Sequence, residues 1–361
     1  MDTFKHTALL HATVKALTAN GKGILAADES PGSMSKKFDP ISVENNETNR
    51  QRYRSMLFAT EGLEEYISGT ILHEETLYQK YDEKSSMVEQ IQKKGIVIGI
   101  KVDKGLKPLW PGQPENPEKF TAGLDSLNDL CERSFARGAR FAKWRCALAV
   151  TDSTPSQLAI DEVARTLARY AKVCQSFGIV PIVEPELLPL GSHSLETCAE
   201  ISRNVFAKLF QLLSDYKVDL KGCLLKPHMI TPGLDHLENW DHVAIGKATA
   251  EVLAETCPAN LGGVFFLSGG QDEGSATKNL LNINKSKKDM GRINFALSFS
   301  FGRALQNGAV NAWKGDDANR DASQKSLMER ARGNWSAVNC VEYVADVKDT
   351  ATKADKEAHC Y

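Results

Sequence analysis

The sequence lacks the features that would indicate a membrane protein or a nucleic-acid-binding protein. None of its 361 residues belongs to an apolar run long enough to form a transmembrane helix. The formal net charge is only -2, from 44 basic and 46 acidic residues, so no overall field favours nucleic acid or an anionic membrane. No basic patch with interleaved aromatic residues is present either. We therefore expect neither partner, and any anionic substrate must be held by a local group of basic side chains.

Disulfide and metal-binding patterns are also missing. The eight cysteines lie far apart with no Cys-x-x-Cys pair, which indicates a reducing compartment, and we expect the cytoplasm. The histidines at 228, 236 and 242 do not have the His-x-x-x-His spacing of a helical metal site, so no metal is expected. Residues 1–17 mix charge and histidine with apolar positions, which predicts an amphipathic helix rather than a signal peptide.

What the sequence does contain is a regular alternation of apolar strands and amphipathic helices. One helix is predicted to start at Ser153-Thr154-Pro155 and end at Gly178, and another to run from Phe120 to Gly138. The strand-like runs are residues 23–28, 67–73, 96–103, 139–146, 180–186, 222–229, 263–268 and 293–300.

Eight such strands alternating with helices predict an α/β fold with a parallel sheet covered by helices. Eight units in about 300 residues fit a (β/α)8 TIM barrel, and an open doubly wound sheet is the alternative. We expect residues 1–336 to form the barrel domain together with the extra N-terminal helix. Residues 337–361 become polar and rich in small residues, and are expected to form a flexible C-terminal arm.

Lys226 interrupts the apolar run at 222–229. An ammonium group is costly to bury and tends to lose its proton there, and a neutral lysine amine is a nucleophile toward a carbonyl carbon. A lysine near a strand end is more often a structural residue whose charge reaches solvent. The hypothesis of a catalytic lysine therefore depends on its neighbours.

Polar residues gather at the C-terminal ends of the predicted strands, which surround the mouth where active sites of this fold lie. Residues two apart on a strand share a face. Three such pairs are Lys101 with Asp103, Lys143 with Arg145, and Glu184 with Glu186. Lys143 beside Lys226 would lower the pKa of Lys226, and a carboxylate among lysines stays ionised and can act as a base.

Two anion sites are predicted at the same mouth. The run Ser268-Gly269-Gly270 offers a hydroxyl and free backbone N–H groups for a phosphate, and Arg303 adds a charge-assisted contact. Ser30, Ser33 and Lys101 would form a second anion site across the mouth. Two phosphate sites that flank a lysine nucleophile imply a bisphosphorylated carbonyl substrate.

With these motifs in place, the chain closely resembles class I fructose-bisphosphate aldolase, the metal-independent Schiff-base enzyme, over almost its full length. The closing Ala358-His359-Cys360-Tyr361 resembles the terminal His-x-Tyr of that family. The other matching stretches are GKGILAADES at 21–30, GIKVDKG at 99–105, FAKWRC at 141–146, IVPIVEPE at 179–186, LLKP at 224–227, LSGGQ at 267–271 and GRAL at 302–305.

The resemblance implies a lyase of glycolysis and gluconeogenesis that reversibly cleaves fructose 1,6-bisphosphate to dihydroxyacetone phosphate and glyceraldehyde 3-phosphate. Lys226 would form an iminium with the C2 ketone, while Glu184 would move protons during carbinolamine formation and C3–C4 cleavage. Asp28 would orient the substrate hydroxyls and help to deprotonate the C4 hydroxyl, and Lys143 would keep Lys226 neutral. Tyr361 would mediate proton transfer at C3. No cofactor is implied, because the iminium is the electron sink.

The resemblance also implies the residues that hold the two phosphates. The predicted substrate-binding set is Ser268, Gly269 and Arg303 at the C1 phosphate, Ser30, Ser33 and Lys101 at the C6 phosphate with Lys36 and Lys37 nearby, Arg145 and Glu186 in support, and Ser300 and Gly302. The chain departs from the family pattern at Pro31, Lys37, Lys221, His228 and Phe301, where Thr, Arg, Glu, Asn or Ser, and Tyr are more familiar. None of these departures removes a group that the chemistry needs.

Partners and alternatives follow from the same resemblance. It implies a homotetramer, sugar phosphates as ligands, and a cytoskeletal (actin-like) scaffold role that would be additional to catalysis. Another lysine Schiff-base barrel enzyme, similar to transaldolase or deoxyribose-phosphate aldolase, is the alternative activity. The paired phosphate sites and the terminal tyrosine argue against it.

Overall fold

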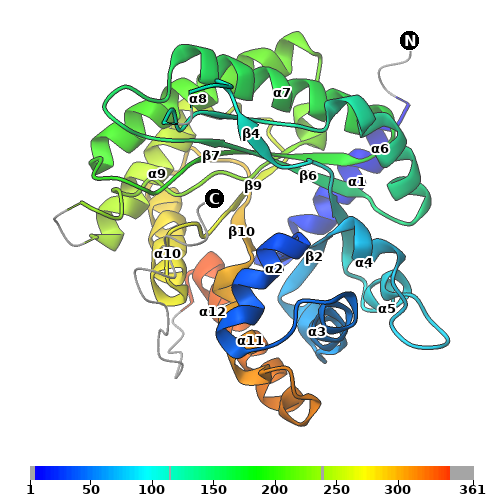
Figure 1. Cartoon of the computed structure of the whole chain (residues 1–361). Coiled ribbons are helices and arrows are strands. Elements are labelled where there is room, and N and C mark those ends of the chain that lie inside the picture. Colours follow the sequence, from blue (N-terminus) through cyan, green and yellow to red (C-terminus); the bar gives the residue numbers. More distant parts are fainter. Residues whose placement is uncertain (1–4, 114, 237–239, 342–361) are drawn as a thin grey trace.

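The computed structural model describes residues 5–113, 115–236 and 240–341. Within them, eight parallel strands close into a barrel in the order β1-β10-β9-β8-β7-β6-β3-β2 (Figure 1). The barrel strands are β1 (Gly23–Ala27), β2 (Ile67–Leu72), β3 (Val97–Lys101), β6 (Phe141–Leu148), β7 (Val180–Leu187), β8 (Leu224–Leu225), β9 (Gly263–Phe266) and β10 (Leu297–Phe301). The predicted (β/α)8 barrel is confirmed, and the open sheet is excluded because β1 pairs with β10.

Most helices of the described residues surround the barrel on its outer side (Figure 1), while α1 (Thr7–Leu17) packs against its interior. The others are α2 (Pro31–Phe38), α3 (Glu47–Ala59), α4 (Glu74–Tyr78), α5 (Met87–Lys93), α6 (Leu127–Ala136), α7 (Gln157–Ser176), α8 (Leu195–Asp215), α9 (His242–Thr256), α10 (Glu273–Met290), α11 (Arg303–Trp313) and α12 (Arg320–Asn339). Short 3-10 turns occupy Ala19–Gly21, Asp39–Ile41, Leu63–Glu65, Leu124–Ser126, Leu220–Gly222 and Asp317–Asn319. A small antiparallel hairpin, β4 (Leu106–Pro108) and β5 (Lys119–Thr121), extends from the barrel. None of the helices in the described ranges combines the length and hydropathy that crossing a bilayer requires.

The strand that precedes Lys226 is much shorter than the predicted run at 222–229. Only Leu224 and Leu225 pair as strand residues, with β7 on one side and β9 on the other. The Lys226 N–H still donates to the Val183 carbonyl at 2.8 Å, but Pro227 has no N–H to continue the ladder. The last predicted run, 293–300, is likewise reduced to a strand that begins at Leu297.

Two predicted helix starts are wrong. The hydroxyl of Ser156 accepts a hydrogen bond from the Ala159 N–H at 3.2 Å and caps α7, so Pro155 precedes the helix instead of occupying its first turn. Phe120 lies in β5, and the helix predicted from it begins only at Leu127. At the other end of the chain, α12 continues to Asn339, past the predicted domain boundary at 336.

The N-terminal helix α1 packs against the interior of the barrel. Its Leu10, Val14 and Leu17 are buried in one apolar cluster with strand residues that include Phe141. The ring of Phe141 needs space that glycine provides on the neighbouring strands. A Cβ added at Gly99 would overlap this ring, and a Cβ at Gly69 would press on both Phe141 and Leu17. The two glycines therefore leave the space that the large Phe141 ring fills in this layer of the barrel.

We predict that Gly99→Ala lowers the free energy of unfolding by about 1–3 kcal/mol, because an added methyl overpacks a filled core. Urea unfolding measures this as a lower midpoint at an unchanged slope. Gly32→Ala is the control, since its Cβ meets no atom within 4 Å. Phe141→Leu in the Gly99→Ala background should recover part of the loss. Equal stability of Gly99→Ala and the unmodified chain would contradict the packing argument.

Candidate active site

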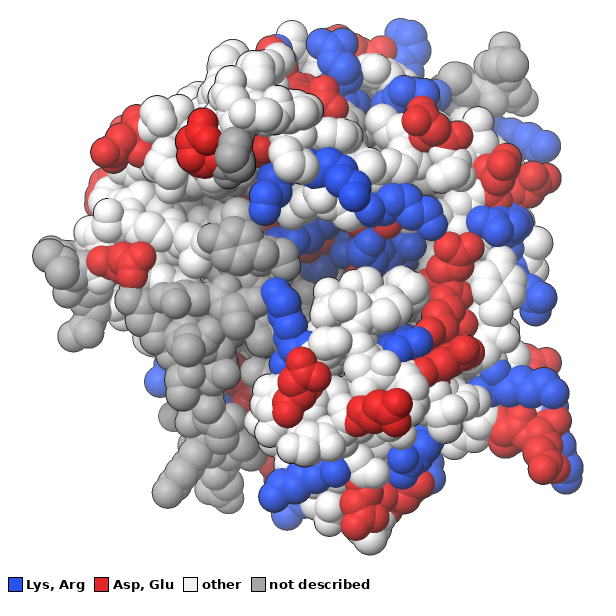
Figure 2. Space-filling model, in the orientation of Figure 1, with Lys and Arg blue, Asp and Glu red and all other residues white. Residues whose placement is uncertain are grey.

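A cavity of about 250 Å³ opens at the C-terminal ends of the barrel strands. Lysine and arginine side chains gather around a hollow on this face of the molecule (Figure 2). Every predicted site residue that the structure describes lines this cavity, from Asp28 after β1 to Arg303 at the start of α11. Tyr361 lies outside the described residues. Ala26, Glu29, Lys36 and Leu267 also line the cavity, and of these the sequence reasoning had noted only Lys36 as near the site.

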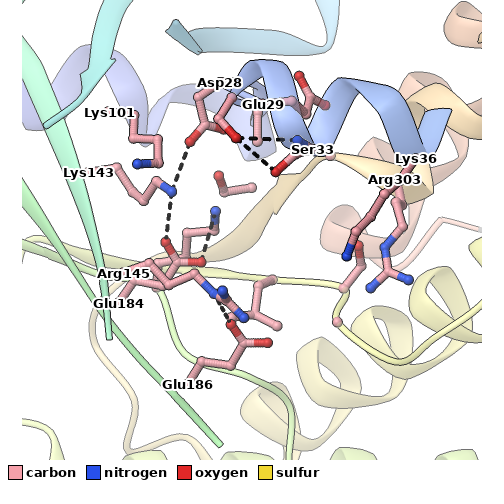
Figure 3. Close-up of a pocket in the computed structure, with 18 of the residues that line it drawn as sticks. Asp28, Glu29, Ser33, Lys36, Lys101, Lys143, Arg145, Glu184, Glu186 and Arg303 are labelled. Atoms are coloured by element: carbon pink, nitrogen blue, oxygen red, sulfur yellow. Dashed lines mark hydrogen bonds and ion pairs between the residues drawn. The ribbon is translucent and has the colours of Figure 1, made fainter. Parts of the chain in front are cut away.

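Four buried side chains of alternating charge form a row at the bottom of the cavity. The Lys143 ammonium lies 2.8 Å from Asp28 Oδ2 and 3.5 Å from Glu184 Oε2 (Figure 3). The other oxygen of Glu184, Oε1, lies 3.3 Å from Lys226 Nζ. Each residue belongs to a different strand: Lys143 and Glu184 lie within β6 and β7, and Asp28 and Lys226 directly follow β1 and β8. The Lys226 side chain is only 6% exposed, so its amine faces the carboxylate and the cavity rather than bulk solvent.

The charges in this row determine one another's protonation. Burial alone would raise the pKa of the Asp28 carboxyl, but the Lys143 ammonium, with smaller contributions from other lysines of the site, outweighs it and holds the pKa well below its usual range. Burial alone would lower the pKa of Lys143, and the carboxylates of Asp28 and Glu184 instead raise it. Asp28 is therefore an anion and Lys143 a cation at neutral pH.

A second ion pair stands beside this row. Arg145 Nε donates to Glu186 Oε2 at 2.5 Å (Figure 3). Burial would raise the pKa of Glu186, but the Arg145 guanidinium outweighs it and lowers the pKa. A Cβ on Gly269 would lie 2.8 Å from Glu186 Oε1, so glycine allows the backbone after β9 to approach this carboxylate closely. Arg145 and Glu186 are thus placed to support the site rather than to react.

The two predicted anion sites lie on different elements of the cavity wall. Ser30 is the N-cap of α2, and its hydroxyl accepts from the Ser33 N–H at 3.3 Å, so both hydroxyls stand at a helix N-terminus. Lys101 lines the same part of the wall and donates to Asp103 Oδ1 at 2.6 Å. The other set, at the ends of β9 and β10, is Ser268, Gly269, Ser300, Gly302 and Arg303. Ser300 Oγ is buried without a hydrogen-bond partner among the described residues, as expected of a ligand contact.

Lys37 lines the cavity, but its ammonium is bound by neighbouring protein side chains. It donates to the Glu29 carboxylate and, at 2.9 Å, to Gln306 Oε1. Burial lowers the pKa of Lys37, although the nearby Glu29 carboxylate opposes this effect. The sequence could not assign this partner, because Glu29 stands in a run with Asp28 and Ser30 and nothing in the pattern says which carboxylate faces which lysine.

His228 does not share the cavity face with Lys226. Its Nδ1 accepts from the Leu187 N–H at 3.2 Å, and its Nε2 lies 2.9 Å from the Ser202 hydroxyl. The regular alternation of a strand would place residues 226 and 228 on one face, but the strand ends at Leu225. Because Nδ1 is an acceptor, the imidazole is neutral, and burial lowers the pKa of His228 to about 4.

The cavity thus combines a buried lysine, a carboxylate next to it and two groups of residues predicted to bind anions. A family model for class I fructose-bisphosphate aldolase matches residues 9–361 of the sequence. The chain belongs to this family. The enzymes of the class are metal-independent lyases, and the described residues contain no group of three or more His, Cys, Asp or Glu side chains able to hold a metal ion.

Individual relatives agree with the family model. Fructose-bisphosphate aldolase 1 of Toxoplasma gondii is 49% identical over 330 residues, which is 91% of this chain and 89% of that protein. The cytosolic fructose-bisphosphate aldolase 4 of Arabidopsis thaliana is also 49% identical, over 88% of this chain and 79% of that protein. A solved structure of the Plasmodium falciparum aldolase, in complex with TRAP and a small-molecule inhibitor, superposes with a TM-score of 0.89 at 43% identity. That superposition covers 93% of this chain and 96% of the other.

We predict that His228 makes the fold sensitive to mild acid. An imidazole in the unfolded chain titrates near 6.5, and the folded one near 4. Between these values the unfolded state binds the extra proton, so stability rises with pH and is lost as the pH falls, by about 1.4 kcal/mol per pH unit. In His228→Asn, the free energy of unfolding should therefore fall less between about pH 6.5 and about pH 4 than in the unmodified chain. Parallel pH curves for the two proteins would contradict this prediction.

Proposed function

We propose that this enzyme reversibly cleaves fructose 1,6-bisphosphate to dihydroxyacetone phosphate and glyceraldehyde 3-phosphate through a Schiff base on Lys226. The observation that carries the proposal is the buried Lys226 amine beside Glu184, in a cavity lined by the residues that we assign to the two phosphates. The family and the names of the relatives support the same reaction.

In the first half of the proposed reaction, the Lys226 amine adds to the C2 ketone and forms a carbinolamine. Glu184 Oε1, at 3.3 Å, is placed to move the protons and to protonate the hydroxyl that leaves as water. Lys143 stays cationic between Asp28 and Glu184 and disfavours a second charge on Lys226. The product of this half is an iminium that can accept an electron pair from the substrate.

In the second half, the C4 hydroxyl loses its proton and the C3–C4 bond breaks. The electron pair of the C3–C4 bond moves toward the iminium nitrogen and leaves an enamine. C4 becomes the aldehyde carbon of the first product. We assign proton acceptance to Glu184, with Asp28 orienting the C4 hydroxyl, because the lowered pKa of Asp28 keeps it anionic. Protonation of the enamine at C3 and hydrolysis of the iminium then release dihydroxyacetone phosphate.

The two phosphates fix the substrate across the mouth. We assign the C1 phosphate to the wall at β9, β10 and α11, where Ser268 and the unpartnered Ser300 hydroxyl line the cavity. The C6 phosphate is assigned to the α2 wall, at Ser30, Ser33 and Lys101. This placement holds C2 next to Lys226, because the ketone carbon is one bond from the carbon that carries the C1 phosphate.

We also propose that the enzyme is cytoplasmic, acts in glycolysis and gluconeogenesis, and assembles as a homotetramer. The cytosolic Arabidopsis relative supports the first point. Equilibrium sedimentation distinguishes a tetramer of 39.7 kDa chains from smaller assemblies, and a monomer would refute the assembly. Binding to cytoskeletal protein would be additional to catalysis, because the described catalytic side chains are all in place.

We predict that borohydride added with dihydroxyacetone phosphate leaves a stable adduct on Lys226. Reduction turns the iminium into a secondary amine, which peptide mass spectrometry locates. Lys226→Met should lose the adduct, and Lys101→Met should keep it because this ligand has no C6 phosphate. Cleavage of fructose 1,6-bisphosphate should persist in a metal chelator. An unmodified Lys226, or activity that the chelator abolishes, would refute the mechanism.

We propose that Tyr361 protonates the enamine at C3. Removing this residue should slow turnover of fructose 1,6-bisphosphate by about 10²–10⁴-fold, the usual contribution of a positioned acid or base. Adduct formation on Lys226 should remain, because it precedes the C3 step. Turnover equal to that of the complete chain would rule out the role.

A further inference from the structure

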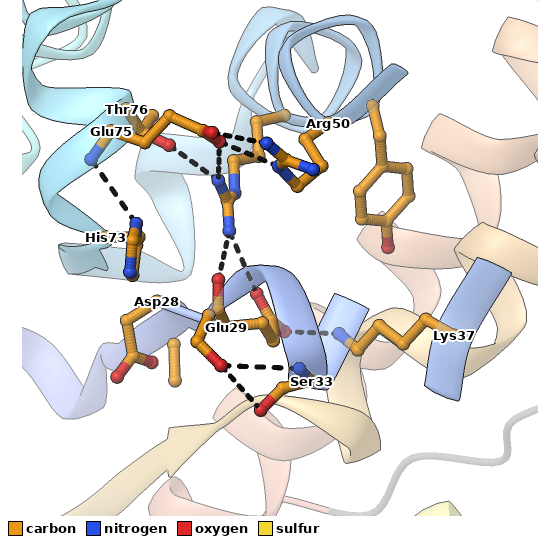
Figure 4. A network of polar contacts seen from close by, with 12 residues as sticks. Asp28, Glu29, Ser33, Lys37, Arg50, His73, Glu75 and Thr76 are labelled. Carbon is orange, nitrogen blue, oxygen red and sulfur yellow. Dashed lines mark hydrogen bonds and ion pairs between the residues drawn. The ribbon is translucent and has the colours of Figure 1, made fainter. Parts of the chain in front are cut away.

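The serines of the proposed C6-phosphate site lie on a short segment whose position depends on helix α3. Ser30 and Ser33 belong to the cap and first turn of α2, which has eight residues. Polar contacts connect the segment around them to α3 along two separate routes, part of which is seen in Figure 4. Both routes start from arginines.

The first route runs from Arg54 to the residue just before Ser30. Arg54 Nη2 donates to the Glu29 carbonyl at 2.6 Å, and Nη1 donates to the Thr76 hydroxyl at 2.8 Å. The Arg54 side chain is 1% exposed, so these contacts are shielded from water and their geometry is well defined. Arg54 Nη2 also lies 3.9 Å from Glu29 Oε2, whose carboxylate is shared with Lys37 and Gln306. The bond to the Glu29 carbonyl is the contact that directly places the chain leading into Ser30.

The second route runs from Arg50 to both sides of Ser33. Arg50 Nη1 donates to Asn45 Oδ1 at 3.0 Å. The amide of Asn45 in turn donates to the Pro31 carbonyl at 2.6 Å and to the Ser35 hydroxyl at 2.7 Å. Asn45 therefore holds α2 at two points that flank Ser33, and Arg50 holds Asn45.

Glu75, in α4, joins the two arginines. It accepts from Arg50 Nε at 2.9 Å and from Arg50 Nη2 at 2.5 Å, and its Oε1 lies 3.4 Å from Arg54 Nη1 (Figure 4). Positions 50 and 54 are one turn apart on α3 and so share a face. The paired fork of Arg50 on the carboxylate restricts direction as well as distance. Burial would raise the pKa of Glu75, but its hydrogen bond with Arg50 outweighs this and lowers the pKa, which keeps the carboxylate charged.

We propose that Arg50, Arg54 and Glu75 are positioning residues that set the C6-phosphate site and thereby the preference for a sugar phosphorylated at C6. The inference rests on the proposed function. None of the three lines the cavity, so they act on substrate only through the α2 segment. The C1-phosphate wall is built on β9, β10 and α11, and α11 meets this network at the Glu29 side chain through Gln306. Arg54 and Asn45 instead bond to the backbone on either side of Ser30, at Glu29 and Pro31. We therefore expect a loss at α3 to affect the C6 end of the substrate more than the C1 end.

The experiment compares kcat/KM for fructose 1,6-bisphosphate and fructose 1-phosphate in Asn45→Ala, Arg54→Met and Arg54→Lys. Arg52→Met is the matched control, because Arg52 lies on the same helix but bonds to Gly315 and Asp317. The fraction of chains that borohydride traps with dihydroxyacetone phosphate measures the fraction of folded sites in each preparation. Asn45→Ala removes no buried charge, so we expect this variant to fold. It therefore tests the proposal even if Arg54→Met does not fold.

We expect Arg54→Met and Asn45→Ala to lose about tenfold in kcat/KM for the bisphosphate, mainly through KM, as for a lost hydrogen bond of about 1.4 kcal/mol. Fructose 1-phosphate should change by less than about twofold, Arg54→Lys should recover part of the loss, and Arg52→Met should match the unmodified enzyme. Proportional losses for both substrates, or no loss for either, would overturn the positioning role. An unmodified enzyme that is not trapped and cleaves neither sugar would instead overturn the proposed function.

Discussion

The site depends on one buried row of alternating charge, in which Lys143 stands between Asp28 and Glu184, and Glu184 stands between Lys143 and Lys226. Taking such ions out of water costs several kcal/mol each unless every one has a partner. The partners come from four different strands, so the row can form only when the barrel is closed. Closure of the barrel is therefore what brings the Lys226 amine and the Glu184 carboxylate together in a buried place, where electrostatic effects are strong.

The residues assigned to the covalent chemistry and the two serines assigned to the C6 phosphate are supported differently. Asp28, Lys143, Glu184 and Lys226 stand on or directly after barrel strands, which are rigid because each strand pairs on both sides. Ser30 and Ser33 instead stand on a short helix outside the barrel. Side chains from α3 and α4 supply contacts that hold this helix in register with the strands. Substrate selectivity and covalent chemistry can thus change separately in this architecture.

Much of this was predictable because it follows from local patterns. The apolar runs predicted the barrel, and the charged residues at their ends predicted the mouth, since parallel strands all end at the same side. The predictions failed where the chain departs from regular geometry. Strand alternation stops at Pro227, so His228 turns toward Leu187 and Ser202 instead of the cavity. Similarly, Ser156 rather than Pro155 defines the start of α7, because a side-chain hydrogen bond fixes the cap.

The sequence by itself determined the fold class, the family and the set of residues at the mouth, because hydrophobic periodicity and short motifs indicate each of them. Only the tertiary structure decided which partner each charge has. The Glu29 carboxylate pairs with Lys37, and Arg54 donates a hydrogen bond to the Glu29 carbonyl, just before Ser30. These pairings join residues from separate elements, and their strength depends on distances and burial that no local pattern contains.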